Sequence, residues 1–410
     1  MPATVRAGAG ARPPMPDNLF SDLLVIDCAS FIAGPAAATV MSDFGARVIK
    51  IEPPGIGDSY RNLFRLRGTP DDVDYFWALD SRNKESLALD LRRPEAMAVL
   101  HTLVKAADVF ITNIPMPSRE RLGVRAQELM PLNERLIYAS LSPYGETGPE
   151  RDRTGFDATA WWARSGMMDM VRDTREVAPS LSLPGMGDHP TAMALYGAIV
   201  TALYKRLKTG RGMEVSTSLM ANGIWANSCQ VQAVLCGYEL LSRPPRGARG
   251  VFNETYRAAD GRYLVVISTN PARDWPLLAK AMGHPEWLED ERFATPEARL
   301  ANSPELVALF DEIFARATFD EWARTLHEGD VTFGVVAEGY DHLADDQAEA
   351  TGLFPEFADG DGLRTVDSPF HLDGETKTQP RMAPGIGQHT RALLAEFGCS
   401  DAEIEALAAE

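Results

Sequence analysis

The chain alternates short apolar runs with helical patterns, and this alternation limits the fold more than any other feature. Residues 23–27 (LLVID) have the pattern of a buried strand, residues 36–44 that of a helix, and residues 47–52 (RVIKIE) that of a second strand. In this order they form a βαβ unit, whose strands run parallel. The pattern continues with elements at 86–90, 94–106, 109–113, 126–132 and 135–140. The sequence therefore predicts an α/β fold with a doubly wound, mostly parallel Rossmann-like sheet that binds ligands at the carboxyl ends of its strands.

The 410 residues are enough for two domains. Long helices are expected at 190–208 and 219–235, and the basic, proline-rich run SRPPRGARG then interrupts the pattern. A strand pair around Asp260-Gly261, followed by helices and a further strand, predicts a smaller α+β domain. The expected boundaries are a flexible arm at 1–18, a large α/β domain at 19–218, a linker helix and loop at 219–250, the small domain at 251–345, and a returning segment at 346–410 that packs on the large domain.

Charge and cysteine usage exclude several classes of protein. The net charge of −18 argues against a nucleic-acid partner or an anionic membrane surface, because both require a basic face. No apolar stretch is long enough to span a bilayer. The four cysteines form no CxxC pair and the seven histidines are widely spaced, so we expect a reduced, cytoplasmic protein with no metal site. Gly55-Ile56-Gly57 lacks the third glycine of a dinucleotide fingerprint.

A carboxylate stands where a glycine-punctuated loop enters an apolar helix, in the run SLPGMGDHPTAMALYGAIV. Gly185 and Gly187 remove side-chain bulk, so a large ligand can approach the backbone before Asp188. Two interpretations follow from the local sequence. Asp188 is either an N-cap that accepts backbone hydrogen bonds, or a reactive carboxylate at the positive end of a helix dipole.

A second set of polar residues flanks the predicted strands. Its members are basic or amide side chains at the edge where an anionic ligand would lie: Arg82, Asn83, Lys84, Asn113, Arg119 and Arg121. Taken singly, each is interpreted as a solvated surface residue. Together they form a candidate phosphate site through charge-assisted hydrogen bonds.

From about residue 20 onward the chain resembles the family III CoA transferases, whose formyl-CoA and carnitine CoA transferases share a fold with α-methylacyl-CoA racemase. The resemblance rests on blocks in family order: VIDCASFIAGPAAATVMSDFGARVIKIEPPGIGD, SRNKESLALDLRRPEA, ADVFITNI, RLIYASLSPYGETGPERDRTGFD, GMGDHPTAMALYGAIVTALYKRLKTGRG and PRMAPGIGQHT. It implies coenzyme A as substrate and product, with no tightly bound cofactor. It also implies a homodimer of interlocked, ring-like chains.

The resemblance also implies roles for individual residues. The nucleophilic aspartate falls on Asp188, preceded by Gly187, and Tyr144 matches a tyrosine near the reacting centre. The residues expected to contact CoA are Ser30, Phe31, Ile32, Asn83, Lys84, Asn113, Ile114, Arg121 and Leu122. No metal ligand is expected.

Departures from the family pattern narrow the range of expected substrates and reactions. Ile32 stands where formyl-CoA transferase has glutamine, Pro53 where it has a CoA-contacting arginine, and the small-domain loop of consecutive glycines is missing. Formate and oxalate are therefore disfavoured as substrates. In the racemase a Gly-His-Asp triplet supplies a base, but here the triplet is Gly155-Phe156-Asp157. Phenylalanine cannot carry a proton, so transfer is favoured over racemisation.

The expected mechanism is transfer of CoA from an acyl-CoA to a carboxylic acid through an anhydride and then an aspartyl-CoA thioester on Asp188. An aspartate with an ordinary pKa of about 3.9 is ionised at neutral pH without help. Backbone N–H groups of residues 185–189 are expected to stabilise the oxyanions of the tetrahedral intermediates. His189 is expected to be a positioning or capping residue. A racemase or epimerase and a non-catalytic CoA-binding relative remain the alternatives. A dicarboxylic acyl group is a candidate substrate, with Arg153 or Arg164 as counter-charge.

Overall fold

The computed structural model describes residues 18–61, 63, 73–239 and 244–408. The arm expected at 1–18 lies outside these residues except for its last position. The described chain forms two compact units. The first comprises residues up to 168, 181–232 and 352–410, and the second comprises residues 169–180 and 233–351. Residues 219–232, which the sequence suggested as linker, thus belong to the first unit.

The first unit is built on a six-stranded parallel sheet of order β3-β2-β1-β4-β5-β6. Its strands are β1 (Leu24–Asp27), β2 (Arg47–Glu52), β3 (Glu85–Ala88), β4 (Val109–Thr112), β5 (Ile137–Ser142) and β6 (Met213–Ser218). This is the order of a Rossmann-type sheet, and it confirms the predicted α/β class and mostly parallel topology. The chain leaves β1 toward β2 on one side and returns to β4 on the other, so the order reverses between β1 and β4.

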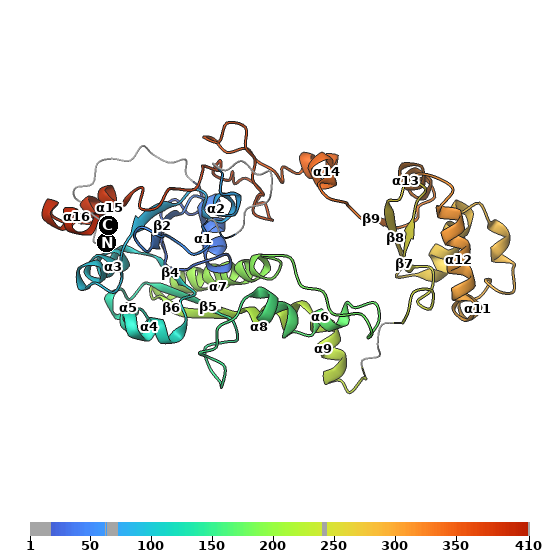
Figure 1. Ribbon diagram of the computed structural model, residues 1–410, viewed down its shortest axis with the longest axis horizontal. Coiled ribbons are helices and arrows are strands. Elements are labelled where there is room, and N and C mark those ends of the chain that lie inside the picture. The colour runs from blue at the N-terminus through green and yellow to red at the C-terminus, as the bar shows by residue number, and fades with distance from the viewer. Residues whose placement is uncertain (1–17, 62, 64–72, 240–243, 409–410) are drawn as a thin grey trace. The chain divides into compact units, whose positions relative to one another are not determined.

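Helices cover both faces of this sheet (Figure 1). The elements of the first unit, including two that run up to or across its boundary, are α1 (Ala33–Asp43), α2 (Tyr75–Ser81), α3 (Pro94–Ala106), α4 (Met116–Leu122), α5 (Ala126–Leu129), η1 (Met130–Leu132), the π-helical η2 (Asp157–Ala163), α6 (Met167–Met170), α7 (Asp188–Thr209), α8 (Leu219–Ala226), α9 (Ser228–Leu235), α15 (Thr390–Glu396) and α16 (Asp401–Ala408).

Alternation along the strands separates two cores. Val25 and Val109 face the cluster formed with α1 and α7, while their neighbours Ile26 and Phe110 face the cluster formed with α3, α5, α15 and α16. Successive strand residues point to opposite faces, so a sheet buried on both sides requires continuous apolar runs. The first three residues of LVID and of VFIT are therefore all apolar and contribute side chains to both cores.

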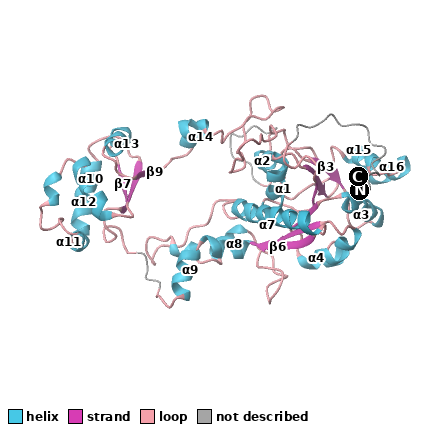
Figure 2. Ribbon diagram, turned by 180° about the vertical axis from the view of Figure 1, so that it is seen from behind, coloured by secondary structure: helices cyan, strands magenta, loops and turns pink. Residues whose placement is uncertain are grey.

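The second unit packs helices on a three-stranded antiparallel sheet of order β7-β8-β9. Figure 2 shows its strands beside their helices. The elements are β7 (Asn253–Arg257), β8 (Tyr263–Ile267), α10 (Pro271–Ala281), η3 (Pro285–Leu288), α11 (Pro296–Ala301), α12 (Ser303–Phe314), α13 (Phe319–Glu328), β9 (Phe333–Val335), η4 (Asp341–Ala344) and α14 (Asp346–Ala350). An aromatic core around Tyr256, Trp287 and Phe310 joins the helices to the sheet.

Several elements differ from the sequence prediction. Strand β6 (MEVSTS) was missed because its side chains alternate exposed and half-buried, without an apolar run. The helix expected at 219–235 is divided at Asn227, whose side chain donates to the Ser165 carbonyl (3.0 Å). Helices α2, α4 and α16 were also missed. Of these, α2 and α4 have only seven residues, too few for periodicity to show. Among the described residues, no helix is both long and apolar enough to cross a membrane.

Candidate active site

The loops after β1 and β4 meet at the point where the strand order reverses. The Ser30 N–H donates to Asn113 Oδ1 (2.8 Å), and Asn113 Nδ2 donates back to the Ser30 carbonyl (2.7 Å). This reciprocal pair ties the two loops together at the carboxyl edge of the sheet. In open α/β sheets this crevice is where ligands bind.

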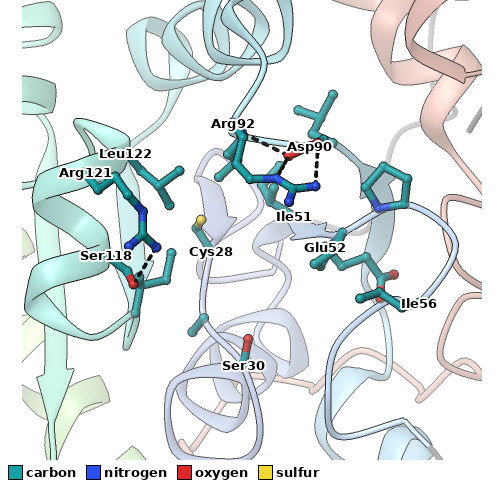
Figure 3. A pocket seen from close by; sticks show the side chains of 16 residues that line it. Cys28, Ser30, Ile51, Glu52, Ile56, Asp90, Arg92, Ser118, Arg121 and Leu122 are labelled. Carbon is teal, nitrogen blue, oxygen red and sulfur yellow. Dashed lines mark hydrogen bonds and ion pairs between the residues drawn. The ribbon is translucent and has the colours of Figure 1, made fainter. Parts of the chain in front are cut away.

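A first cavity of about 550 Å³ opens beside this pair (Figure 3). Figure 3 shows Arg121 on one side of Cys28 and Arg92 on the other. Most of the other residues that line this cavity are apolar, among them Ile51, Ile56, Leu89, Ile114 and Leu122. Guanidinium groups at the rim and an aliphatic floor suit a ligand with both phosphates and an apolar ring or chain.

The polar groups of the first cavity are partly engaged within the protein. Arg121 Nη2 donates to Ser118 Oγ (3.1 Å), and Arg92 makes a two-pronged ion pair with Asp90 (2.8 Å on each arm). Burial raises the pKa of the Cys28 thiol to about 12. Cys28 therefore stays a neutral thiol, and the arginines carry the positive charge of this cavity.

A second cavity of about 300 Å³ shares Ser30 and Ile114 with the first and contains Asp188. Its walls are rich in apolar side chains. Phe31 and Phe156 meet edge to face with ring centroids 5.6 Å apart. The two cavities therefore adjoin along the Ser30 loop, and the second one presents Asp188 among apolar groups.

The position of Phe31 depends on buried charges behind it. Its φ of +63° lies in the left-handed region, which a residue with a Cβ adopts at a cost of about 1–2 kcal/mol. The Phe31 N–H donates to Asp58 Oδ1 (3.1 Å), and Asp58 Oδ2 pairs with Lys50 (2.7 Å). The buried ion pair thus offsets the strain and fixes the turn that forms the cavity wall.

Asp188 is the first residue of α7, and Gly187 is its N-cap, with no side-chain capping bond. The N-cap interpretation of Asp188 is therefore wrong, because the helix begins one residue earlier than that role requires. The Gly187 N–H donates to Asp157 Oδ2 (3.3 Å), so this expected oxyanion donor is already engaged. A Cβ at Gly187 would lie 2.6 Å from the Trp161 ring, which explains the glycine.

The environment of Asp188 changes its acidity. Burial raises the pKa of Asp188 to about 7, and the negative charge of Asp157 adds to the rise while His189 opposes it. The expectation of full ionisation at an ordinary pKa is therefore wrong. Sequence could not show this, because the desolvation comes from residues distant in the chain.

The ring nitrogens of His189 face Asp80 and Gly185. Its Nε2 lies 3.1 Å from Asp80 Oδ1, and its Nδ1 lies 3.2 Å from the Gly185 carbonyl oxygen. Desolvation lowers the pKa of His189, but the hydrogen bond and charge of Asp80 outweigh it and leave the pKa above its ordinary value.

The structure brings most of the predicted site residues together. The second cavity is lined by Ser30, Phe31, Ile32, Asn113, Ile114 and Asp188, and the first by Ser30, Ile114, Arg121 and Leu122. Pro53 also lines the first cavity. Tyr144 lines neither. It is buried behind Gly155, with the Arg153 guanidinium 5.2 Å above its ring.

Asn83 and Lys84 do not line either cavity; the assignment of Lys84 as a CoA ligand is revised, and that of Asn83 stays a prediction. Lys84 Nζ is fully buried and donates to Asp27 Oδ2 (2.9 Å) and to the Pro35 and Asp80 carbonyls (2.8 Å each). All three of its protons are therefore used inside the protein. Asn83 Oδ1 accepts from the Arg381 N–H (2.8 Å), which ties the turn before β3 to the C-terminal segment.

Two arginines from the same sequence set are also held internally. Arg82 pairs with Asp43 (2.9 and 2.7 Å), and Arg119 pairs with Glu146 (2.6 Å). Of the cations in the predicted phosphate set, only Arg121 lines the first cavity. Arg92 was missed, because the loop after β3 was not counted among the ligand-binding loops. The topological rule itself would have found it, since every parallel strand ends at this edge.

Within the described part of the chain, no group of three or more His, Cys, Asp or Glu side chains is placed to hold a metal ion. The candidate chemistry therefore rests on Asp188, the basic rim of the first cavity and the loops between them.

Comparison with known proteins agrees with this geometry. The family model for CoA-transferase family III matches residues 20–390, so the chain belongs to that family and is an enzyme of it. It is 30% identical to (R)-2-hydroxy-4-methylpentanoate CoA-transferase of Clostridioides difficile, over 94% of this chain and 97% of that protein. It is 29% identical to cinnamoyl-CoA:phenyllactate CoA-transferase of Clostridium sporogenes, over 95% and 96%. The crystal structure of a CAIB/BAIF family protein from Brucella suis has a TM-score of 0.80 at 28% identity, covering 92% of this chain and 98% of that one.

The burial of Lys84 gives a first prediction. Replacing Lys84 by Met removes one of the positive charges that face the buried Asp27 carboxylate. We expect a loss of about 3–5 kcal/mol in the free energy of unfolding, measured with urea. Lys105→Met, on the exposed side of α3, is the matched control and should change little. Unchanged stability of Lys84→Met together with weakened CoA binding would restore Lys84 as a ligand.

The raised pKa of Asp188 gives a second prediction. The folded protein holds this proton more tightly than the unfolded chain, so ionising Asp188 costs stability as pH rises from about 4 through about 7. Asp188→Asn should therefore stabilise the protein by at least about 1 kcal/mol at pH 8 and by little at pH 4. Unfolding in urea at both pH values checks this. A difference that is independent of pH would contradict it.

Proposed function

We propose that this protein transfers CoA from an acyl-CoA thioester to a free carboxylic acid, with Asp188 as the covalent nucleophile. The observation that carries the proposal is the placement of Asp188 in a cavity that adjoins a basic-rimmed cavity at the reversal point of the sheet. The family to which the chain belongs supports the overall reaction.

The first cavity is the proposed site for the nucleotide end of CoA. Arg92 and Arg121 supply positive charge for its phosphates, and Leu89 and Leu122 supply apolar surface for its ring. The pantetheine arm would pass Ser30 and Ile114, which line both cavities, and deliver the thioester to Asp188. Asn113 then acts on the arm chiefly by fixing the Ser30 loop.

The proposed chemistry balances without water or an external acid. An Asp188 carboxylate oxygen attacks the thioester carbonyl and the C–S bond breaks. CoA departs as the thiolate, and the acyl group stays on Asp188 as a mixed anhydride. The thiolate attacks the aspartyl carbonyl of the anhydride, which releases the donor acid and forms an aspartyl-CoA thioester. The acceptor carboxylate then repeats the two steps in reverse order. Only the ionised form of Asp188 can begin this sequence.

Transfer is preferred over proton exchange because the described lining of the second cavity has no histidine to act as the second base of the racemase. Phe156 occupies the place of the racemase histidine, and no histidine lines the cavity among the described residues. Asp157 Oδ1 accepts from the Ala158 N–H (2.7 Å) and Oδ2 from the Gly187 N–H (3.3 Å), so it supports the loop before α7.

The acyl group is proposed to be apolar, aromatic or branched. Of the arginines lining the second cavity, Arg119 is paired with Glu146, Arg151 with Glu120, and Arg153 with Glu150. Each arginine in the described lining thus already faces a carboxylate, so a second carboxylate of the substrate would have to displace one, and Arg164 is paired with Glu150 as well. The dicarboxylic candidate stays a prediction, and we rank it below an apolar acyl group. Phe31, Met116, Leu141 and Phe156 would instead contact a hydrocarbon group.

A homodimer is proposed as the working state. The helices α7, α8 and α9 carry large apolar side chains that are well exposed in the single chain: Tyr204, Leu207, Trp225 and Leu235. Monomeric proteins rarely expose so many large apolar side chains, so a second copy of the chain is the proposed partner that buries them.

Asp188 provides the direct test. Incubation with cinnamoyl-CoA followed by hydroxylamine should convert Asp188 to a hydroxamate that mass spectrometry locates, and Asp188→Ala should lose transfer by at least about 1,000-fold while still binding CoA. Enzyme treated with hydroxylamine alone is the control. Appreciable turnover by Asp188→Ala with both substrates saturating would contradict the assignment of Asp188 as nucleophile.

Acyl selectivity provides a separate test. With phenyllactate as acceptor, kcat/KM for cinnamoyl-CoA or 4-methylpentanoyl-CoA should exceed that for succinyl-CoA by about tenfold or more, because a second carboxylate would have to displace a carboxylate of the protein from its arginine. Phe156→Ser should reduce this preference. A preference for succinyl-CoA would contradict the apolar assignment and leave the nucleophile untouched.

A further inference from the structure

The side chain next to the proposed nucleophile is held by two acceptors. His189 lies on a third cavity, of about 460 Å³, between α1, α2, α7 and residues 366–369. Its Nε2 faces Asp80 Oδ1 at 3.1 Å and its Nδ1 faces the Gly185 carbonyl oxygen at 3.2 Å. Asp80 is almost fully buried, whereas 45% of the His189 side chain is exposed.

These two contacts define the protonation of the ring. A neutral imidazole has one N–H donor, and the other nitrogen must accept. A backbone carbonyl can only accept, and an ionised carboxylate can only accept. With a carboxylate at Asp80, both ring nitrogens must donate, so the two contacts fit an imidazolium at His189.

We propose that His189 is a positioning residue whose positive charge keeps Asp188 in the carboxylate form required for attack. The inference rests on the proposed role of Asp188. It assigns His189 no contact with substrate, since the residue lines the third cavity and is absent from the lining of the second.

The charges around Asp188 show why such a group is needed. Asp157 on η2 and Asp80 on α2 both oppose its ionisation, and burial adds to their effect. His189 is the group that favours ionisation. Around His189 itself, the charged or titratable groups are Asp80 and Asp188, with Arg82 and Asp367 on the third cavity and Tyr60 beside Asp80. The imidazolium of His189 thus opposes the combined effect of Asp157 and Asp80 on Asp188.

Backbone geometry fixes the ring in this place. Gly185 has a φ of +79°, and a Cβ built there would lie 3.1 Å from the His189 ring. The glycine both turns its carbonyl toward Nδ1 and leaves room for the ring. The sequence Gly-Met-Gly-Asp-His therefore supplies the turn, the nucleophile and the charge in five consecutive residues.

The test compares His189→Gln, which keeps a donor for Asp80 without the charge, with His327→Gln on the exposed surface of α13. Transfer from cinnamoyl-CoA to phenyllactate is measured from about pH 5.5 to about pH 9.5 in steps of about half a pH unit. For His189→Gln, the pH at which activity is half-lost on acidification should rise by roughly one unit or more. The rates of the two variants should converge at the alkaline end. His327→Gln should follow the unmodified enzyme throughout.

A second measurement does not depend on turnover. Carboxyl ¹³C NMR of aspartate-labelled protein, with Asp188→Asn used to identify the signal, should show the same rise in the Asp188 pKa in His189→Gln. The ¹⁵N shifts of His189 in the unmodified protein should show both nitrogens protonated at pH 7. A pH-independent loss of activity with an unmoved Asp188 signal, or a neutral His189 at pH 7, would overturn the inference. Turnover by Asp188→Ala would instead overturn the proposed function.

Discussion

The site depends on a buried charge network formed by β1, β2, the loop after β2 and the turn before β3. Asp27 ends β1 and pairs with Lys84 (2.9 Å), while Lys50 on β2 pairs with Asp58 (2.7 Å) and also lies 3.7 Å from Asp27. These groups are desolvated, so removing any one leaves an uncompensated charge in the core. Through Asp58 the network fixes the turn at Phe31, and the cavity walls follow from it.

The start of α7 balances two opposed requirements. In the proposed reaction, burial lets Asp188 meet a thioester away from water, yet burial also favours its neutral form and raises its pKa to about 7. Asp157 increases this effect while holding the Gly187 N–H in place. The helix start and the neighbouring His189 act in the opposite direction. The resulting carboxylate is poised near neutral pH, where a small change in its surroundings changes its ionised fraction.

Sequence patterns were sufficient for the parallel sheet and for much of the site. The apolar runs LVID and VFIT predicted buried parallel strands, and the rule for strand ends placed Ser30, Asn113 and Arg121 at one edge. The patterns failed where polar residues had internal partners. Arg82, Lys84 and Arg119 looked like phosphate ligands, but each neutralises a buried carboxylate. A sequence shows that a residue is charged and does not show which distant residue faces it.

The sequence by itself determined the fold class, the family and the identity of the carboxylate after the glycine loop, because these depend on local periodicity and on residues close together in the chain. Only the tertiary structure decided which cations face the first cavity, that Asp188 begins its helix without capping it, and that its pKa is raised. Those properties depend on desolvation and on pairs such as Asp80 with His189, 109 positions apart, which form only when the chain is folded.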